Sequence, residues 1–304
     1  MFDSYQDMNQ IEDHLWLGNM CAAFDPKQLL ANNVRSVLSV FDDHWKEDNR
    51  SSEITYKQIW VDDVPREEML THMTTDAFEF IRQAQESGQG ILVHCHMGYS
   101  RSATVVIGYL MQKYKKPFNE TIRMVQKQRE IGPNEGFILQ LRMFETMNYR
   151  LDGNHRPFRH VLLEMVLDSE IFYRKWKNQL NEYYRRLDMI ENSVDGGVQL
   201  GPNYLCAKCG HKLFNDIHIV KKTGIESDDY DCDFLYIEPQ KWMKELSELE
   251  VNTVDTKPVK CPDCDEKLVE YNSRFNNYMC PCPQHQGLNC LRFIINKSNV
   301  KIEN

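Results

Sequence analysis

This sequence of 304 residues has no long apolar run and no excess of positive charge, and it has few cysteines in its first two thirds. The longest apolar stretch, ATVVIGYLM at residues 103–111, is half of the roughly 18 residues that suggest a membrane-spanning helix. The formal net charge of -9 disfavours binding of nucleic acid by bulk electrostatics, because that requires a basic surface. We therefore expect no membrane segment and no direct bulk binding of nucleic acid.

A secretory leader is not evident in the first residues either. The stretch MFDSYQDMNQIEDHLW is polar and acidic, without the charged and then apolar layout of a signal peptide. This favours an intracellular protein whose cysteines are free thiols or metal ligands rather than disulfides. Hydrophobic residues still make up 41% of the chain, which is enough for a globular core.

Residues 1–150 show alternating strand and helix patterns. The predicted strands cover 36–41, 55–61 and 90–95, and the predicted helices cover 74–88, 102–115, 118–129 and 134–150. This alternation predicts an α/β domain with a central sheet flanked by helices.

The rest of the chain has a different composition. Residues 151–200 have helical spacing with many charged residues and end in VDGGVQLGP, so we expect a helical connector and a flexible joint. Residues 201–304 combine short strand patterns with eight of the ten cysteines, which predicts a small, mainly β domain.

The segment HCHMGYSRS, residues 94–102, joins a predicted strand to a predicted helix. Cys95 ends the strand and Arg101 begins the helix, with Gly98 allowing a tight loop between them. Such a loop can wrap its backbone N–H groups and the positive helix end around an anion, and the guanidinium adds a fork of donors. The same field favours a thiolate, which predicts a nucleophile aimed at a bound phosphate.

The other residues of this segment support that prediction. The predicted phosphate-binding loop consists of His96, Met97, Gly98, Tyr99, Ser100 and Arg101. His94 can orient the loop by hydrogen bonds, and Ser102 can donate a hydrogen bond to the sulfur. The competing interpretation, a buried Cys95 beside a chance arginine, does not account for this ordered set of neighbours.

VHCHMGYSRS resembles the signature of the dual-specificity protein phosphatases. Three further segments resemble that family in the same order along the chain: IEDHLWLGNMCAA, IWVDDV and IGPNEGFILQL. The resemblance covers about residues 10–150. It implies a cysteine-dependent phosphatase fold and phosphoprotein substrates with phosphotyrosine and phosphoserine or phosphothreonine. It also implies that catalysis needs no cofactor.

The family places a general acid about thirty residues before the cysteine. Asp62 and Asp63 are the candidates, and matching the V-x-D pattern favours Asp63. The resemblance implies a cycle in which Cys95 takes the phosphoryl group, Asp63 protonates the leaving oxygen and later activates water, and Arg101 holds the phosphate.

Two similar segments, YLCAKCGHKLF and VKCPDCDEKLV, each contain a Cys-x-x-Cys pair typical of zinc knuckles. Two ions need eight ligands, and the candidates are Cys206, Cys209, His218, Cys232, Cys261, Cys264, Cys280 and Cys282. His285 and Cys290 are alternatives for the eighth ligand, and His211 is less favoured. Either both knuckles share one ion, or His218 and Cys232 join the first knuckle. The thiolate-rich sets indicate structural zinc.

The C-terminal region also resembles the zinc-binding tail of the dual-specificity phosphatase twelve family and its fungal counterparts. The resemblance rests on CDFLYIEPQKWM, the two knuckles, the Cys-x-Cys pair and FIINKSNVK. It implies a role in maturation of the large ribosomal subunit, with pre-ribosomal particles as partners in the nucleus and cytoplasm. The alternative function is therefore a zinc-dependent assembly factor in which catalysis is secondary.

Overall fold

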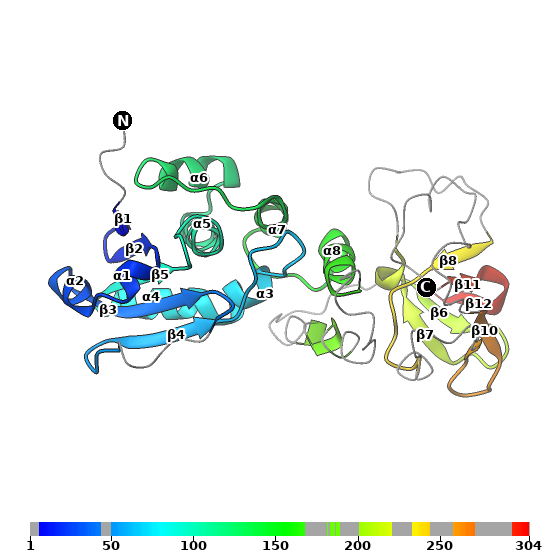
Figure 1. The fold of residues 1–304 in the computed structure, drawn as a ribbon. Helices are drawn as coiled ribbons and strands as arrows, with labels where there is room; N and C mark the ends of the chain where they lie inside the picture. Colours follow the sequence, from blue (N-terminus) through cyan, green and yellow to red (C-terminus); the bar gives the residue numbers. More distant parts are fainter. Residues whose placement is uncertain are drawn as a thin grey trace. The chain divides into compact units, whose positions relative to one another are not determined.

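The computed structural model divides the chain into two units, Met1–Leu151 and Asp152–Asn304 (Figure 1). The described residues are 6–43, 50–167, 181, 183–185, 187, 188, 201–220, 233–243, 258–270 and 294–303. None of the helices in these ranges combines the length and apolar character needed to cross a membrane.

The first unit is built on a mixed sheet. Its five strands, in spatial order, are β1 (Met8–Glu12), β2 (Leu15–Gly18), β5 (Gly90–His94), β3 (Val34–Val40) and β4 (Thr55–Ile59). Strand β1 is antiparallel to β2, and the other pairs are parallel. Every residue of β5 is buried because this strand lies in the middle of the sheet, which explains its continuous apolar sequence.

Helices cover this sheet. They are α1 (Met20–Ala23), α2 (Pro26–Ala31), α3 (Leu70–His72), a π-helical turn (Met73–Ala77), α4 (Phe78–Glu86), α5 (Arg101–Tyr114), α6 (Phe118–Gln126) and α7 (Glu135–Thr146). Helix α5 packs against β5 and β3, while α6 and α7 pack on α5 in turn (Figure 1). The α5 residues from Arg101 to Met111 are all buried. The predicted cysteine-dependent phosphatase fold is confirmed.

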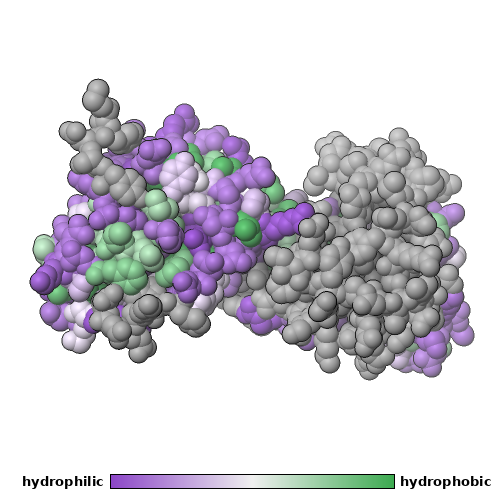
Figure 2. All heavy atoms as spheres, in the orientation of Figure 1, coloured by the Kyte–Doolittle hydropathy of each residue, from purple (hydrophilic) through white to green (hydrophobic). Residues whose placement is uncertain are grey.

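Side chains alternate across the central strands, so each strand contributes to two layers. Leu92 of β5 joins Val37 and Phe41 in a buried cluster with α1 and α2. Ile91 and Val93 therefore face the opposite side of the sheet. On the face shown in Figure 2, hydrophilic side chains cover most of the described surface of the first unit, and apolar side chains form smaller patches.

The described strands of the second unit are short and antiparallel. They form one group of β12 (Val300–Glu303), β6 (Asn203–Cys206) and β7 (Lys212–Asn215), and two pairs, β9 (Pro258–Lys260) with β10 (Lys267–Glu270) and β8 (Phe234–Tyr236) with β11 (Ile294–Asn296). This arrangement, with its cysteine cluster, is compatible with a small zinc-binding domain.

Helix α8 (Arg156–Leu167) lies in the segment for which the sequence suggests a connector. The structure groups it with the second unit. Arg159 of α8 makes a buried ion pair with Glu238, each side chain being 3% exposed, and the shortest distance is 2.6 Å. Tyr184, farther along the same segment, lies under the Lys241 ammonium group. Apart from Leu151, the described parts of residues 151–200 thus belong to the second unit.

Candidate active site and thiol cluster

Cys95 lies directly after β5 and before α5, in a loop that the sheet and helix hold from both sides. The residue is 2% exposed, and Ser102 donates a hydrogen bond from Oγ to its Sγ at 3.2 Å. Because Ser102 belongs to the first turn of α5, the sulfur lies at the positive end of that helix. Gly98 has φ of +68°, and a Cβ there would overlap the carbonyl oxygen of Gly18, so only glycine fits.

His94 is fully buried beneath this loop. Its Nδ1 lies 3.3 Å from the carbonyl oxygen of Cys95, and its Nε2 lies 2.8 Å from the hydroxyl of Ser39. Since a carbonyl can only accept, Nδ1 carries the hydrogen and Nε2 accepts from Ser39. Burial lowers the pKa of His94 to about 4, although the bond to Cys95 opposes this. The ring is therefore neutral near pH 7 and orients the loop.

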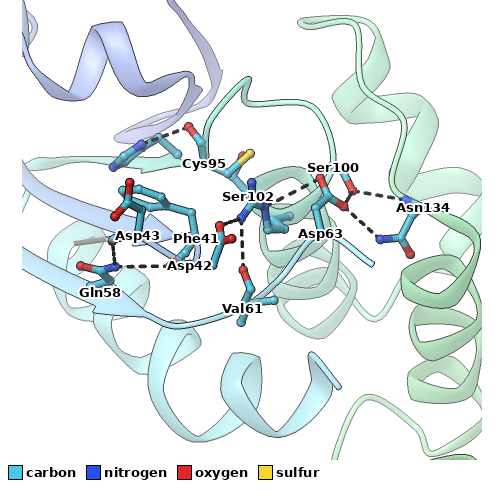
Figure 3. Close-up of polar contacts among 12 residues, drawn as sticks. Phe41, Asp42, Asp43, Gln58, Val61, Asp63, Cys95, Ser100, Ser102 and Asn134 are labelled. Carbon is cyan, nitrogen blue, oxygen red and sulfur yellow. Dashed lines mark hydrogen bonds and ion pairs between the residues drawn. The ribbon is translucent and has the colours of Figure 1, made fainter. Parts of the chain in front are cut away.

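The Arg101 side chain is 9% exposed and turns toward the carboxyl ends of the neighbouring strands. Its Nη1 donates to Asp42 Oδ1 at 2.6 Å and to the carbonyl oxygen of Val61 at 3.2 Å (Figure 3). Its buried Nε has no hydrogen-bond partner among the described residues. An unpaired buried donor is costly, and a phosphate oxygen is a suitable acceptor for it.

Asp42 follows β3 and was not found by sequence reasoning. Its hydrogen bond from Arg101 lowers the pKa of the Asp42 carboxyl, so the carboxylate stays charged beside the guanidinium. The sequence signal was weak because Asp42 is one acidic residue among several after a strand. Its position becomes informative only when β3 is known to lie next to β5.

Asp63 lies beyond the end of β4 and faces the loop (Figure 3). Its Oδ1 accepts hydrogen bonds from Ser100 Oγ at 2.6 Å and from Asn134 Nδ2 at 3.0 Å. Its Oδ2 lies 3.7 Å from Nε of Arg101. The structure therefore brings Asp63 into the same group as Arg101 and Ser100, although Asp63, like Asp62, is exposed to solvent.

The remaining loop side chains differ in exposure. His96 is exposed, Met97 is 53% exposed and Tyr99 is 45% exposed, whereas Ser100 is buried. The outer side of the loop thus presents His96 together with the large side chains of Met97 and Tyr99, and its inner side presents backbone, hydroxyl and guanidinium groups.

Arg129 is a second buried arginine beneath the loop, and sequence reasoning missed it. Its guanidinium donates to the carbonyl oxygens of Gly98 and Met97, both at 3.1 Å. It also donates to Asn9 Oδ1 at 2.7 Å and to the carbonyl oxygen of Gln6 at 2.9 Å. These bonds tie the loop to the N-terminal hairpin and add positive charge to it. No local pattern marks Arg129, because these four partners come from other segments.

In the second unit, the two knuckles meet. The sulfur atoms of Cys206, Cys209, Cys261 and Cys264 all lie within 4.8 Å of one another. Cys206 and Cys264 are 3.8 Å apart, and Cys209 and Cys261 are 3.7 Å apart. A tetrahedral zinc site with bonds of about 2.3 Å has sulfur atoms roughly 3.8 Å apart, so this donor set fits zinc. Burial raises the pKa of Cys206, but backbone N–H groups of Cys209 and Lys208 lower it to about 7.

The two knuckles share one backbone geometry. The carbonyl oxygen of Cys206 accepts from the Gly210 N–H at 2.9 Å, and that of Cys261 accepts from the Asp265 N–H at 3.1 Å. Gly210 and Asp265 both have a positive φ, 78° and 56° respectively. This matching geometry accounts for the similarity of the two segments and favours the arrangement in which both pairs bind one ion.

The other predicted ligands are not placed in this cluster. Cys232, Cys280 and Cys282, with the alternatives His285 and Cys290, lie outside the described residues. His218 is half-buried, and its Nδ1 accepts a hydrogen bond from the Asn215 N–H at 3.1 Å. Burial lowers the pKa of His218 to about 4, which keeps the ring neutral. The exposed His211 is likewise not a member of the four-thiol cluster.

Comparisons with known proteins agree with this geometry. The family model described as dual specificity phosphatase, catalytic domain, matches residues 15–147. Dual specificity protein phosphatase 1B of Arabidopsis thaliana is 36% identical over 150 residues, covering 48% of this chain and 86% of that protein. The nucleophile loop and fold define a cysteine-dependent phosphatase. More specifically, the chain belongs to the dual specificity phosphatase family.

Two other relatives match far more of the chain. Dual specificity protein phosphatase 12 of Homo sapiens is 25% identical over 302 residues, covering 90% of this chain and 83% of that protein. Tyrosine-protein phosphatase yvh1 of Schizosaccharomyces pombe is 25% identical over 289 residues, covering 93% and 82%. The similarity to these two proteins therefore extends into the second unit, whereas the Arabidopsis protein matches about half of the chain.

Proposed function

We propose that this chain hydrolyses phosphotyrosine and phosphoserine or phosphothreonine in proteins through a phosphocysteine intermediate. The observation that carries the proposal is the buried Cys95 sulfur at the start of α5, which accepts a hydrogen bond from Ser102. The same loop contains the buried Arg101, whose Nε has no hydrogen-bond partner among the described residues. Such a site provides a nucleophile and a binding place for a phosphoryl group within one loop.

The first step transfers the phosphoryl group to the enzyme. The Cys95 thiolate attacks phosphorus, the bond between phosphorus and the substrate oxygen breaks, and Asp63 gives its proton to that oxygen. Arg101 and the loop N–H groups bind the phosphoryl oxygens. In the second step, water attacks phosphorus while Asp63 accepts a proton from it. The bond between sulfur and phosphorus breaks, phosphate leaves, and Ser102 stabilises the released thiolate by its hydrogen bond.

The composition of the loop supports phosphoprotein substrates. Between Cys95 and Arg101 the sequence has no lysine or arginine that could bind the additional phosphates of a phosphoinositide. The exposed side chains there are those of His96, Met97 and Tyr99, and the last two suit apolar contacts with a peptide.

Hydrolysis of an aryl phosphate and of two phosphopeptides, one with phosphotyrosine and one with phosphothreonine, tests this function. We expect Cys95→Ser and Arg101→Ala to abolish turnover, because each removes a group that contacts the phosphoryl oxygens or phosphorus. Cys21→Ser is the matched control, since Cys21 is an exposed thiol of the same unit. Full activity of Cys95→Ser would contradict the mechanism, and turnover of only one phosphopeptide would contradict dual specificity.

We also propose that the four-thiol cluster holds a structural zinc ion and that His218, Cys232, Cys280 and Cys282 hold a second. The support for the first ion is the sulfur spacing, which leaves no open position for substrate. The second set completes the eight ligands required by two ions, with His285 and Cys290 as the alternatives to His218. Zinc would supply folding energy to the second unit, while the nucleophile of the first step and the general acid and base of the catalytic cycle come from the first unit of the chain.

A second function is proposed for the second unit, namely support of large ribosomal subunit maturation in the nucleus and cytoplasm. The resemblance of the knuckles and tail supports it, together with the similarity of the human and fission yeast relatives across 90% or more of this chain. Residues 201–304 contain 13 Lys and Arg against 16 Asp and Glu, so a partner recognised by shape is favoured over a phosphate backbone.

Co-sedimentation with large-subunit precursors separates the two functions. We expect Cys95→Ser to remain bound to the particles, and Cys261→Ser, which removes a thiol of the cluster, to be released from them. The opposite pattern would contradict a role for the second unit and would instead place the contact in the catalytic unit.

A further inference from the structure

We propose that α7 is the element that positions the general acid, with Asn134 as its main positioning residue. The inference rests on the proposed role of Asp63 as that acid. Residues 61–70, which run from the end of β4 to the start of α3, are called the acid loop below. The acid loop contacts both α7 and the phosphate-binding loop.

The amide of Asn134 is fixed by the helix that it caps. Its Oδ1 accepts a hydrogen bond from the Phe137 N–H at 3.0 Å, as expected for the N-cap residue of a helix. Because this donor needs an oxygen, the orientation of the amide is determined, and the NH₂ group must point the other way. It points to Asp63 Oδ1 at 3.0 Å.

Asp63 Oδ1 therefore receives two donors at once. Ser100 Oγ donates to it at 2.6 Å, and Ser100 in turn accepts from the Asn134 backbone N–H at 3.3 Å (Figure 3). An oxygen with two donors is poorly placed to carry a proton of its own. The geometry thus assigns the catalytic proton to Oδ2, the oxygen that lies 3.7 Å from Nε of Arg101.

Helix α7 also contacts the acid loop beyond Asp63. A Cβ on Gly136 would overlap the carbonyl oxygen of Pro65, so the loop lies directly on the first turn of the helix. Gln140, which is 1% exposed, accepts from the Met69 N–H at 2.7 Å and donates to the carbonyl oxygen of Glu67 at 2.8 Å. The acid loop is thereby held along its length in the absence of substrate, which preorganises the acid.

The competing explanation is that Asn134 serves only as a helix cap. Serine caps helices about as well as asparagine, but its side chain is shorter and has no amide donor. Asn134→Ser should therefore keep the cap and lose the contact with Asp63, whereas Asn134→Ala loses both. A comparison of the two variants separates capping from positioning.

The first measurement uses two aryl phosphates with different leaving groups. Phenyl phosphate has a poor leaving group that needs a proton, whereas a polyfluorinated aryl phosphate releases a phenolate that does not. We expect Asn134→Ser to lower kcat/KM roughly tenfold for phenyl phosphate, within the total of about 10²–10⁴ that a general acid contributes, and to leave the fluorinated substrate nearly unchanged. Equal losses on both substrates would overturn the inference.

The second measurement is a double-mutant cycle with Asp63→Asn. If Asn134 acts through Asp63, adding Asn134→Ser to Asp63→Asn should cause no further loss on phenyl phosphate. A further loss of about tenfold would show that Asn134 acts through the fold, and the inference would be wrong. Melting temperatures are expected to be unchanged in Asn134→Ser and lowered in Asn134→Ala.

The cycle also separates this inference from the proposed mechanism. Wild-type turnover of phenyl phosphate by Asp63→Asn would remove Asp63 as the acid, and the inference would fall with it. A different result would reject only the role of Asn134. In that case Asp63→Asn turns over phenyl phosphate slowly, as the mechanism requires, while Asn134→Ser resembles the wild type on both substrates.

Discussion

The two cysteine sites of this chain both contain buried thiols, although Cys209 is exposed and Cys264 is half-buried, and they differ in what surrounds the sulfur. Cys95 is 2% exposed, and Cys206 and Cys261 are 0% exposed. The neighbour of the Cys95 sulfur is a serine hydroxyl at 3.2 Å, whereas the neighbours of the knuckle sulfurs are other thiols at 3.7 and 3.8 Å. Burial therefore does not distinguish a nucleophile from a metal ligand, while the chemical type of the nearest groups does.

The two sites also differ in what holds the backbone around them. Buried side chains, above all Arg129 and His94, fix the loop of the first unit. In the second unit, repeated backbone hydrogen bonds form the knuckles, and four thiols that would repel one another as thiolates need a cation to hold them together. The first site should thus form from the chain alone, and the second should depend on metal.

Removal of zinc from the second unit is the largest expected effect. Because structural zinc contributes about 10–16 kcal/mol in zinc-finger peptides, a strong chelator or Cys261→Ser should unfold the residues around the cluster. Turnover of an aryl phosphate should stay the same, because Cys95 and its neighbours lie in the other unit. Zinc content, protease sensitivity of residues 201–304 and the turnover rate are measured on the same sample.

The matched control for that experiment is Cys21→Ser, which changes a thiol outside the cluster. It should keep both the metal and the protease resistance. A chelator that stops turnover as strongly as it releases metal would show that the two sites are not independent in this way.

Substitution of Arg129 is the next largest effect and concerns the first site. Arg129→Met removes the donors to the carbonyl oxygens of Met97 and Gly98, and leaving such buried groups unpaired costs about 1–3 kcal/mol each. We expect a loop that binds phosphate less well, with a lower kcat/KM and slower alkylation of Cys95 near neutral pH. Alkylation by iodoacetate followed across pH measures the effect on the thiolate.

Arg123→Met serves as the control for charge, because Arg123 is an exposed arginine of α6, the helix that precedes Arg129. It should have a wild-type alkylation profile. Identical profiles for Arg123→Met and Arg129→Met would mean that the loop keeps its shape without the buried guanidinium.

The neutral state of His94 predicts a pH dependence of stability. The pKa of His94 is about 4 in the fold and about 6.5 in an unfolded chain, so the unfolded state binds more protons between these values. Stability of the first unit should be fully present above pH 6.5 and should fall by up to about 3 kcal/mol as the pH drops through this window to 4. Hydrogen exchange of the β5 amides detects the change, which His94→Gln should reduce and His96→Gln should not.

The sequence predicted the residues of the first site more completely than the residues that hold them in place. The loop residues from Cys95 to Ser102 are consecutive, and the apolar strand and helix on either side are strong local signals. This part of the site can therefore be predicted from the sequence. Asp42 and Arg129 act through contacts with distant segments, for which no local pattern exists. The cap role of Asn134 follows a local pattern, because asparagine is a common residue at the start of a helix, but its hydrogen bond to Asp63 depends on the packing of α7.

Element ends show the same limitation. The sequence favoured a helix start at residue 74, whereas helical structure begins at Leu70. The reason is that Glu68 accepts a hydrogen bond from the Thr71 N–H at 2.8 Å and Gln140 of α7 accepts from the Met69 N–H. A glutamate and a distant glutamine thus replace the usual cap residue, and neither is a standard start signal.

The smallest expected effect concerns the backbone of the two knuckles. Gly210 and Asp265 hold equivalent positions with positive φ, and nothing lies within 4 Å of a Cβ added to Gly210. The cost of Gly210→Ala is therefore purely conformational, about 1 kcal/mol, or roughly fivefold in zinc affinity. Gly210→Asp should cost less, since aspartate tolerates this region and already occupies it at Asp265. A competition titration with a zinc chelator ranks the zinc affinities of the variants. A larger loss of zinc affinity for Gly210→Asp than for Gly210→Ala would mean that charge near the thiolates, rather than backbone geometry, sets the affinity of this site.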